Sequence, residues 1–217
     1  FYEKIIHLNI ESVVLLTKLF LPSIQQHKNG YILNLGSLAS FYPIPFKIVY
    51  AGLIGVAQGI EGIIKNVHLP SDFEIHIYGN GPLSSKVKEI CNKNPQLFYH
   101  GLLKREELHQ TLIDFDATII PLKNRIYGSV PSKIFEYSKL GLPIIYFSDG
   151  EGADIVEKFN LGITQRVIDY KLLEKKFHQL SKNEIELPKK EYVQKTAYEN
   201  FSIYDQFDKL QKKLFLQ

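Results

Sequence analysis

The residues best suited to chemistry stand together at positions 130–137, Val-Pro-Ser-Lys-Ile-Phe-Glu-Tyr, at the start of a predicted helix. The hydroxyl of Ser132 can cap exposed backbone N–H groups. The helix dipole disfavours the cation of Lys133 at this end, and a bound anion would compensate for it. The carboxylate of Glu136 can accept hydrogen bonds from two hydroxyl groups, as in a ribose diol. The alternative is a capping box, but that motif needs its glutamate three positions after the cap, and Glu136 lies four after Ser132.

Two glycine-rich turns are predicted to follow strands of one parallel sheet. The first contains Gly52 and Gly55, between a strand and a helix that runs to residue 67. The second contains Gly79, Asn80 and Gly81. Glycine lets backbone N–H groups approach a phosphate closely, and helix N-termini attract anions. Tight turns also need glycine for geometry alone, so both interpretations stay open.

Strand and helix patterns alternate along most of the chain, which predicts a parallel sheet with right-handed crossovers. The expected fold class is α/β, a Rossmann-like sheet with helices on both faces, preceded by an N-terminal helix–strand segment. In such sheets ligands bind beyond the carboxyl ends of the strands, where the glycine turns lie. The predicted strands cover residues 47–51, 73–78, 97–100, 117–122, 143–147 and 163–167, and the predicted helices cover 55–67, 83–92, 104–113, 132–140, 153–159 and a tail from 170 with a break near Pro188.

These motifs resemble, in order and spacing over about residues 47–167, the C-terminal half of a GT-B glycosyltransferase of the GT4 type. The matching runs are Tyr-Ala-Gly…Gly-x-Ala-Gln-Gly, Tyr-Gly-Asn-Gly-Pro, Phe-Tyr-His-Gly and Val-Pro-Ser-Lys-Ile-Phe-Glu-Tyr…Gly-Leu-Pro-Ile-Ile. The resemblance implies a domain that binds a nucleotide-sugar, commonly a UDP-sugar, as its substrate, with no metal and no cofactor. It also implies that Glu136 holds the ribose hydroxyls, and that Ser132 and Lys133, with the turn from Gly52 to Gly55, face the diphosphate.

The chain departs from this family at two places. Gly128 stands where many relatives carry an additional glutamate, and the turn after Gly52 lacks the arginine and lysine with which they clamp the diphosphate. Contact with the diphosphate would then fall to Lys133, Lys123 or Arg125. In the family a second domain binds the acceptor, so we expect nucleotide-sugar binding with little or no transfer by this chain alone. A folded but inactive α/β scaffold is a further alternative.

The first 46 residues resemble a different family, the middle of a short-chain dehydrogenase/reductase. The run Gly-Tyr-Ile-Leu-Asn-Leu-Gly-Ser-Leu-Ala-Ser places Ser37 after a predicted strand, and Tyr50 follows thirteen positions later. By resemblance, Ser37 would orient a substrate carbonyl and Tyr50 would donate a proton, which makes an NAD(P)-dependent oxidoreductase the alternative function. Ile54 replaces the lysine that lowers the tyrosine pKa in that family, and the cofactor-binding glycine turn is absent, so reductase activity is not expected.

Two domains are therefore predicted, a dehydrogenase-like helix–strand fragment over residues 1–46 and a donor-binding domain over residues 47–217. The two resemblances meet around residues 46–51, which indicates a chimera, with a natural single domain and a chance match as the alternative. The helix predicted over residues 5–27 has apolar residues at helical spacing and is expected to be largely buried on one face of the sheet. The strand over residues 31–35 is expected to pair with a sheet edge. A loose helix would instead expose an aggregation or dimerisation patch.

Composition excludes several classes of function. The net charge is +3 and the lysines are scattered, which argues against nucleic-acid binding, and no apolar run reaches the roughly 18–20 residues of a membrane span. The single cysteine, Cys91, allows no internal disulfide and is expected to pack in the core of a cytoplasmic protein. A lipid-linked acceptor would bring the protein to the inner face of the membrane as a peripheral partner. The absence of methionine leads us to expect a piece of a longer gene product.

Overall fold

The chain divides into two structural units. A computed structural model describes residues 7–27, 31–32, 44–124, 128–202, 207 and 211 of the 217 residues. Contacts separate a unit over Phe1–Pro43 from a unit over Ile44–Gln217. This boundary follows Pro43, and the boundary predicted from the sequence follows residue 46.

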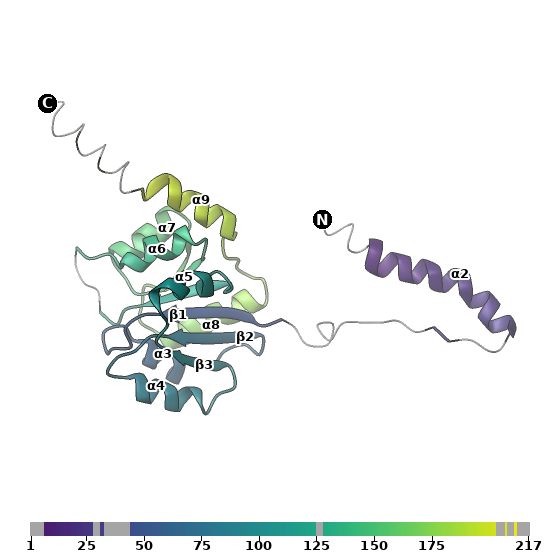
Figure 1. The fold of residues 1–217 in the computed structure, drawn as a ribbon, viewed down its shortest axis with the longest axis horizontal. Helices are drawn as coiled ribbons and strands as arrows, with labels where there is room; N and C mark the ends of the chain where they lie inside the picture. The colour runs from purple at the N-terminus through teal and green to yellow at the C-terminus, as the bar shows by residue number, and fades with distance from the viewer. Residues whose placement is uncertain are drawn as a thin grey trace. The chain divides into compact units, whose positions relative to one another are not determined.

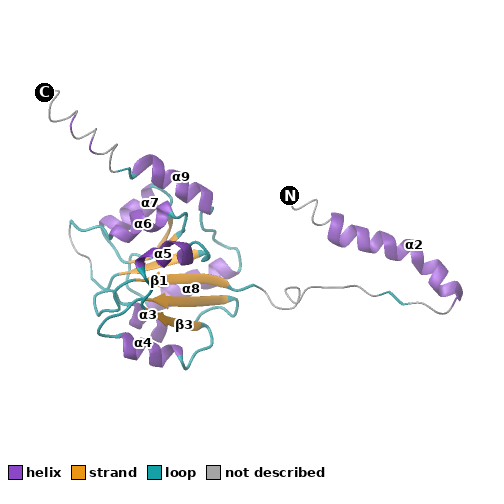
Figure 2. Cartoon of the chain, in the orientation of Figure 1, coloured by secondary structure: helices purple, strands orange, loops and turns teal. Residues whose placement is uncertain are grey.

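The second unit is built on one parallel sheet (Figure 2). Its strand order is β3-β2-β1-β4-β5-β6, so β1 lies between β2 and β4 at the centre. Ile48 of β1 stands opposite Ile75 on one side and Ala117 on the other. This confirms the predicted fold class. The strands are β1 (Phe46–Ala51), β2 (Phe73–Tyr78), β3 (Leu97–Gly101), β4 (Ala117–Pro121), β5 (Ile144–Phe147) and β6 (Gly162–Thr164).

Helices cover both faces of this sheet (Figure 1). Alternate strand residues point to opposite faces, and they form two separate apolar layers. In the first layer Ile75 and Ile77 pack with α3 (Ile60–Asn66), α4 (Ser84–Cys91) and α8 (Tyr170–Ser181). In the second layer Val49 and Ile120 pack with α5 (Arg105–Leu112), α6 (Ser132–Lys139), α7 (Glu151–Lys158) and α9 (Lys190–Asn200). Each layer shields one face of the sheet from water.

The segment after β1 differs from its prediction. A helix was expected from Gly55, but α3 begins at Ile60. The backbone between β1 and α3 is bonded to the loop after β2 instead: Ile54 N–H donates to the Asn80 carbonyl at 3.0 Å, and Leu83 N–H donates to the Ile54 carbonyl at 3.1 Å. The Ile54 carbonyl would have to accept the first hydrogen bond of a helix that begins at Gly55. Because it is already bonded to Leu83, the first helical turn is displaced.

The first unit contains η1 (His7–Glu11, a π-helical turn) and α2 (Ser12–His27). No residue of α2 is buried, and Leu19 is 70% exposed. Within this unit no other described element covers its apolar side chains, and its packing on a face of the sheet stays a prediction. Tyr31 and Ile32 belong to no strand, and residues 33–35 of the predicted strand lie outside the described part of the chain.

None of the described helices combines the length and hydrophobicity that crossing a bilayer requires.

Candidate functional site

A cavity of about 420 Å³ opens at the carboxyl ends of β1 and β2. It brings Gly52 and Gly79 together with Lys133 and Glu136 of α6, which lie some 50–80 positions further along the chain. This is the edge at which parallel α/β sheets bind their ligands. Its wall is formed by Ala51, Gly52, Leu53, Tyr78, Gly79, Asn80, Leu102, Leu103, Leu108, Lys133, Glu136 and Tyr137.

The glycines at this edge allow two loops to touch. Gly52 has φ +154° and Gly79 has φ +136°, and a Cβ atom on Gly79 would overlap the carbonyl group of Gly52. Gly52 N–H donates to the Tyr78 carbonyl at 2.9 Å, and Gly79 N–H donates to the Gly101 carbonyl at 2.7 Å. Loop geometry alone therefore requires these glycines, whatever they bind.

Of three further residues predicted to bind the nucleotide-sugar, one lines the cavity and two do not. Gly55 and Gly81 do not line the cavity, and Gly81 packs directly against the backbone of Ile54. Asn80 lies on the cavity wall. The Asn80 side-chain oxygen accepts bonds from Gly81 N–H at 2.8 Å and from the Ser84 hydroxyl at 2.9 Å. This side chain therefore fixes the second glycine turn.

Lys133 reaches from the start of α6 to the end of β1. Its ammonium group donates to the Ala51 carbonyl and lies 5.0 Å from the ring centre of Tyr50. Burial lowers the pKa of Lys133 to about 8, and the nearby Glu136 carboxylate opposes this shift. Lys133 also lines a second cavity of about 230 Å³, together with Ser132 and Gln58. A partly desolvated cation thus stands on the wall of both cavities.

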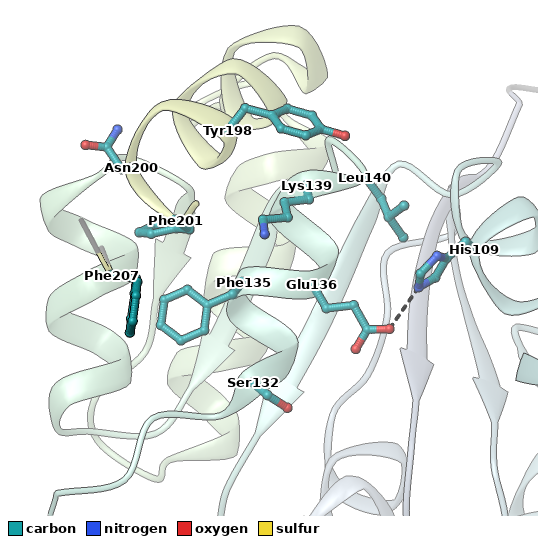
Figure 3. A pocket seen from close by; sticks show the side chains of 10 residues that line it. All are labelled: His109, Ser132, Phe135, Glu136, Lys139, Leu140, Tyr198, Asn200, Phe201 and Phe207. Atoms are coloured by element: carbon teal, nitrogen blue, oxygen red, sulfur yellow. Dashed lines mark hydrogen bonds and ion pairs between the residues drawn. The ribbon is translucent and has the colours of Figure 1, made fainter. Parts of the chain in front are cut away.

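The start of α6 excludes the capping-box interpretation. Pro131 is the N-cap and makes no side-chain cap, so Ser132 is the first helical residue and is exposed. Glu136 lies too far into the helix to complete such a box. Its carboxylate instead accepts a hydrogen bond from His109 Nε2 of α5 at 2.9 Å (Figure 3). The glutamate is therefore a wall residue of the cavity and no part of a helix cap.

An apolar groove lies on the other side of Glu136. Its volume is about 980 Å³, and Figure 3 shows the side chains that line it. Phe135 and Phe201 meet edge to face there, with ring centres 5.0 Å apart. Glu136 and its partner His109 belong to this groove, and Glu136 belongs also to the smaller cavity. Glu136 therefore stands between the groove and the cavity, and His109 contacts it from the groove.

Comparison with known families decides the classification. The family model "Glycosyl transferases group 1" matches residues 41–200, which is most of the chain. The chain belongs to the group 1 glycosyltransferases. This confirms the resemblance read from the motifs.

Solved structures share the fold of this group 1 glycosyltransferase. The lipopolysaccharide outer core galactosyltransferase WaaB superposes with a TM-score of 0.66 at 14% identity, over 80% of this chain and 50% of that one. Anabaena HepE in complex with UDP gives 0.67 at 12% identity, over 83% and 52%. The catalytic domain of the Helicobacter pylori cholesterol-α-glucosyltransferase gives 0.57 at 18% identity, over 73% and 99%. The chain spans about half the length of the first two relatives.

The N-terminal segment matches another family. A short chain dehydrogenase model covers residues 2–60 and overlaps the transferase match over residues 41–60. A very-long-chain 3-oxoacyl-CoA reductase of Anas platyrhynchos is 41% identical over 49 residues, which are 23% of this chain and 16% of that protein. In the structure the overlap includes β1, whose two neighbours are strands of the transferase sheet.

Tyr50 is built into the core of the transferase fold. It is 2% exposed, and its hydroxyl donates to the Leu53 carbonyl. Burial raises the pKa of Tyr50, which makes it a weaker acid. Ile54, at the position of the dehydrogenase lysine, is also buried, and Ser37 lies outside the described residues. These surroundings do not favour an acid–base role for Tyr50.

Sequence reasoning missed part of the cavity wall. Leu102 and Leu103 follow β3, and Tyr78 ends β2, so a search of every strand end would have included them. Tyr137 was passed over as a helix residue, yet its hydroxyl donates to the Ala51 carbonyl at 2.9 Å. His109 carries no recognisable motif and was also missed. The two leucines and two tyrosines give the cavity its apolar and aromatic surface, whereas His109 lines the apolar groove.

Neither a metal cluster nor an exposed thiol is found among the described residues. The described residues contain no group of three or more histidine, cysteine or acidic side chains that could hold a metal ion. Cys91 is buried in α4, and burial raises the pKa of its thiol to about 11. Its predicted packing role is confirmed, since a buried, protonated thiol is a poor nucleophile.

Proposed function

We propose that residues 44–202 bind the nucleotide-sugar donor of a glycosyl transfer, and that this donor is a UDP-sugar. The convergence of Lys133 and Glu136 on the loops of Gly52 and Gly79 at one cavity carries the proposal. A volume of about 420 Å³ falls within the roughly 300–1,000 Å³ of small-molecule sites. UDP complexes of structural relatives such as HepE support the choice of nucleotide.

Each end of the nucleotide has a suitable partner. Glu136 would accept hydrogen bonds from the ribose hydroxyls, since a carboxylate has two oxygens and about four acceptor sites. Lys133 would face the diphosphate from the start of α6, close to the Ala51 carbonyl. Its partial burial strengthens attraction to an anion, because the local dielectric is lower than that of water. Ser132 lies beside it on the wall of the second cavity.

The diphosphate contact depends on one side chain more than in many relatives. Among the described residues that line the two cavities, Lys133 is the one lysine or arginine. Lys123 lies near Gly59, where its N–H donates to the Ala57 carbonyl at 2.9 Å, and Arg125 lies outside the described residues. We therefore expect modest affinity that is sensitive to any change at Lys133.

We further propose that the chain in isolation transfers little or no sugar. The described residues supply one α/β unit, and the chain spans about half of relatives such as WaaB. A second domain would then bring the acceptor. The name of WaaB, a lipopolysaccharide galactosyltransferase, supports a lipid-linked acceptor. With such an acceptor the protein would act in the cytoplasm, at the inner face of the membrane.

Residues 1–46 are proposed to be a fragment of a short-chain dehydrogenase joined to the transferase unit, without reductase activity. The overlapping family matches and the unit boundary after Pro43 support this chimeric organisation. The buried Tyr50 and the isoleucine at position 54 support the loss of the dehydrogenase chemistry.

Calorimetric titration with UDP tests the donor-site proposal. We expect UDP to bind the unmodified chain and Glu136→Gln to weaken binding about tenfold or more, because hydrogen bonds to a charged partner contribute about 1.5–3 kcal/mol. Glu174→Gln is the matched control, since Glu174 also accepts a bond from a histidine, His68 at 3.1 Å, but lies on α8. Absence of heat at millimolar UDP with a folded protein, or equal loss in both variants, would refute the proposal.

A further inference from the structure

We propose that His109 is a positioning residue that orients the Glu136 carboxylate for the ribose hydroxyls. This inference rests on the donor-site function proposed above. His109 belongs to α5 and Glu136 to α6, so the contact joins two helices that are separated by β4 in the chain. Nε2 of His109 lies 2.9 Å from Oε1 of Glu136. Neither family motif includes His109.

The packing of α5 holds the imidazole at this position. Leu112, one turn after Leu108, is fully buried, and Leu108 packs against the same core layer and lines the cavity. His109, the next residue, lines the apolar groove, where its side chain meets Glu136 (Figure 3). Apolar contacts therefore hold the helix in place, and its histidine side chain makes a hydrogen bond to the carboxylate.

The glutamate needs such a partner because its side chain is long and 42% exposed. An unrestrained carboxylate at this exposure would sample several rotamers, and ordering it on ligand binding would weaken affinity. Lys133, three positions before Glu136 on the same helix, is bonded to the Ala51 carbonyl. Lys139 lines the groove on the far side of Glu136. His109 is the neighbour that makes a hydrogen bond to the carboxylate.

The histidine contact is compatible with ribose binding. A carboxylate offers about four acceptor sites on two oxygens, and His109 uses one of them on Oε1. The remaining sites can accept both hydroxyls of a diol. The bond to His109 therefore fixes the plane of the carboxylate and leaves acceptor sites open for the ribose hydroxyls.

Calorimetry with UDP and 2′-deoxy-UDP on the whole chain tests this role. Ordering one side chain on binding costs about 0.5–1.5 kcal/mol, which corresponds to a roughly three- to tenfold loss of affinity. We expect His109→Ala to weaken UDP binding by this factor and to affect 2′-deoxy-UDP less, because one of the oriented hydroxyls is missing. His109→Gln, whose amide nitrogen can replace Nε2, is expected to restore UDP affinity.

His68→Ala is the matched control, because it removes another exposed His–Glu contact, His68 with Glu174, away from the cavity. It should leave both affinities unchanged. Unchanged UDP affinity in His109→Ala, tighter binding, or equal weakening of both nucleotides would each overturn the inference while the donor site stands. Failure of the unmodified chain to bind UDP would instead refute the proposed function, and this inference with it.

Discussion

Replacing Gly79 by alanine tests whether the contact between the two glycine loops builds the cavity. Gly79 follows β2 directly and lies against the backbone of Gly52, which follows β1. An alanine Cβ would overlap the Gly52 carbonyl oxygen and lie 2.9 Å from the carbonyl carbon. Backbone cannot move aside as a flexible side chain can, so the loops must separate.

The expected loss of stability has two parts. Gly79 has φ +136°, a conformation that side chains rarely adopt, and such strain costs of the order of 1–3 kcal/mol. Separation of the loops also weakens the bonds from Gly52 N–H to Tyr78 and from Gly79 N–H to Gly101, each contributing about 1 kcal/mol. The sum is roughly 3–5 kcal/mol, a large part of the about 5–15 kcal/mol that stabilises a typical domain.

Gly101→Ala provides the matched control. Gly101 also has a positive φ, +76°, but a Cβ there would meet nothing within 4 Å. Its cost should be the backbone strain alone, about 1–2 kcal/mol. Urea unfolding followed by circular dichroism gives both values, and UDP titration shows whether the cavity survives. If Gly79→Ala loses no more stability than Gly101→Ala, the close approach of the loops is not what holds this edge together.

Two further predictions concern ionisation and the N-terminal segment. Because burial lowers the pKa of Lys133 to about 8, UDP affinity should fall as the pH rises above about 8 and the cation is lost. The free energy of unfolding should rise as the pH increases from about 8 to the ordinary lysine pKa of 10.5, because the unfolded chain binds this proton more tightly than the folded chain does. Calorimetry across this range should show proton uptake with UDP, and a Lys133→Gln variant that keeps the same pH profile would contradict this role. The chain should not oxidise NADH or NADPH with any of a panel of carbonyl substrates, followed at 340 nm; turnover abolished by Tyr50→Phe would restore the oxidoreductase alternative.

Much of the transferase fold could be predicted from the sequence, because its strands are short apolar runs and the first three of them end at a glycine. β2 was predicted with its observed bounds, and α6 within one residue. The start of α3 could not be predicted, since it depends on the bonds of Ile54 to the loop after β2, a tertiary contact without a local signal. Helical periodicity likewise shows that α2 has an apolar face but not what covers that face, so its packing on the sheet stays a prediction.

The candidate site was predictable where a motif carries its own chemistry. Lys133 and Glu136 do so, and the structure places both on one cavity with Gly52 and Gly79. His109 could not be found in this way, because its relation to Glu136 exists only after α5 and α6 have packed on the sheet. Gly55 and Gly81 look like binding residues in the sequence, but they lie off the cavity wall.

The central position of β1 has a consequence for how the transferase unit assembles. Strands β1 to β3 lie outward in chain order on one side and β4 to β6 on the other, so among the described strands the β1–β4 pairing joins two halves that are each local in sequence. Gly52 and Gly79 belong to the first half, and Lys133 and Glu136 to the second. A nucleotide bound by residues of both halves would stabilise the β1–β4 pairing, since a ligand that binds only the joined state stabilises that state by mass action. Partly folded chains would have no complete cavity, so an increase in thermal stability on adding the ligand would report that β1 and β4 have paired.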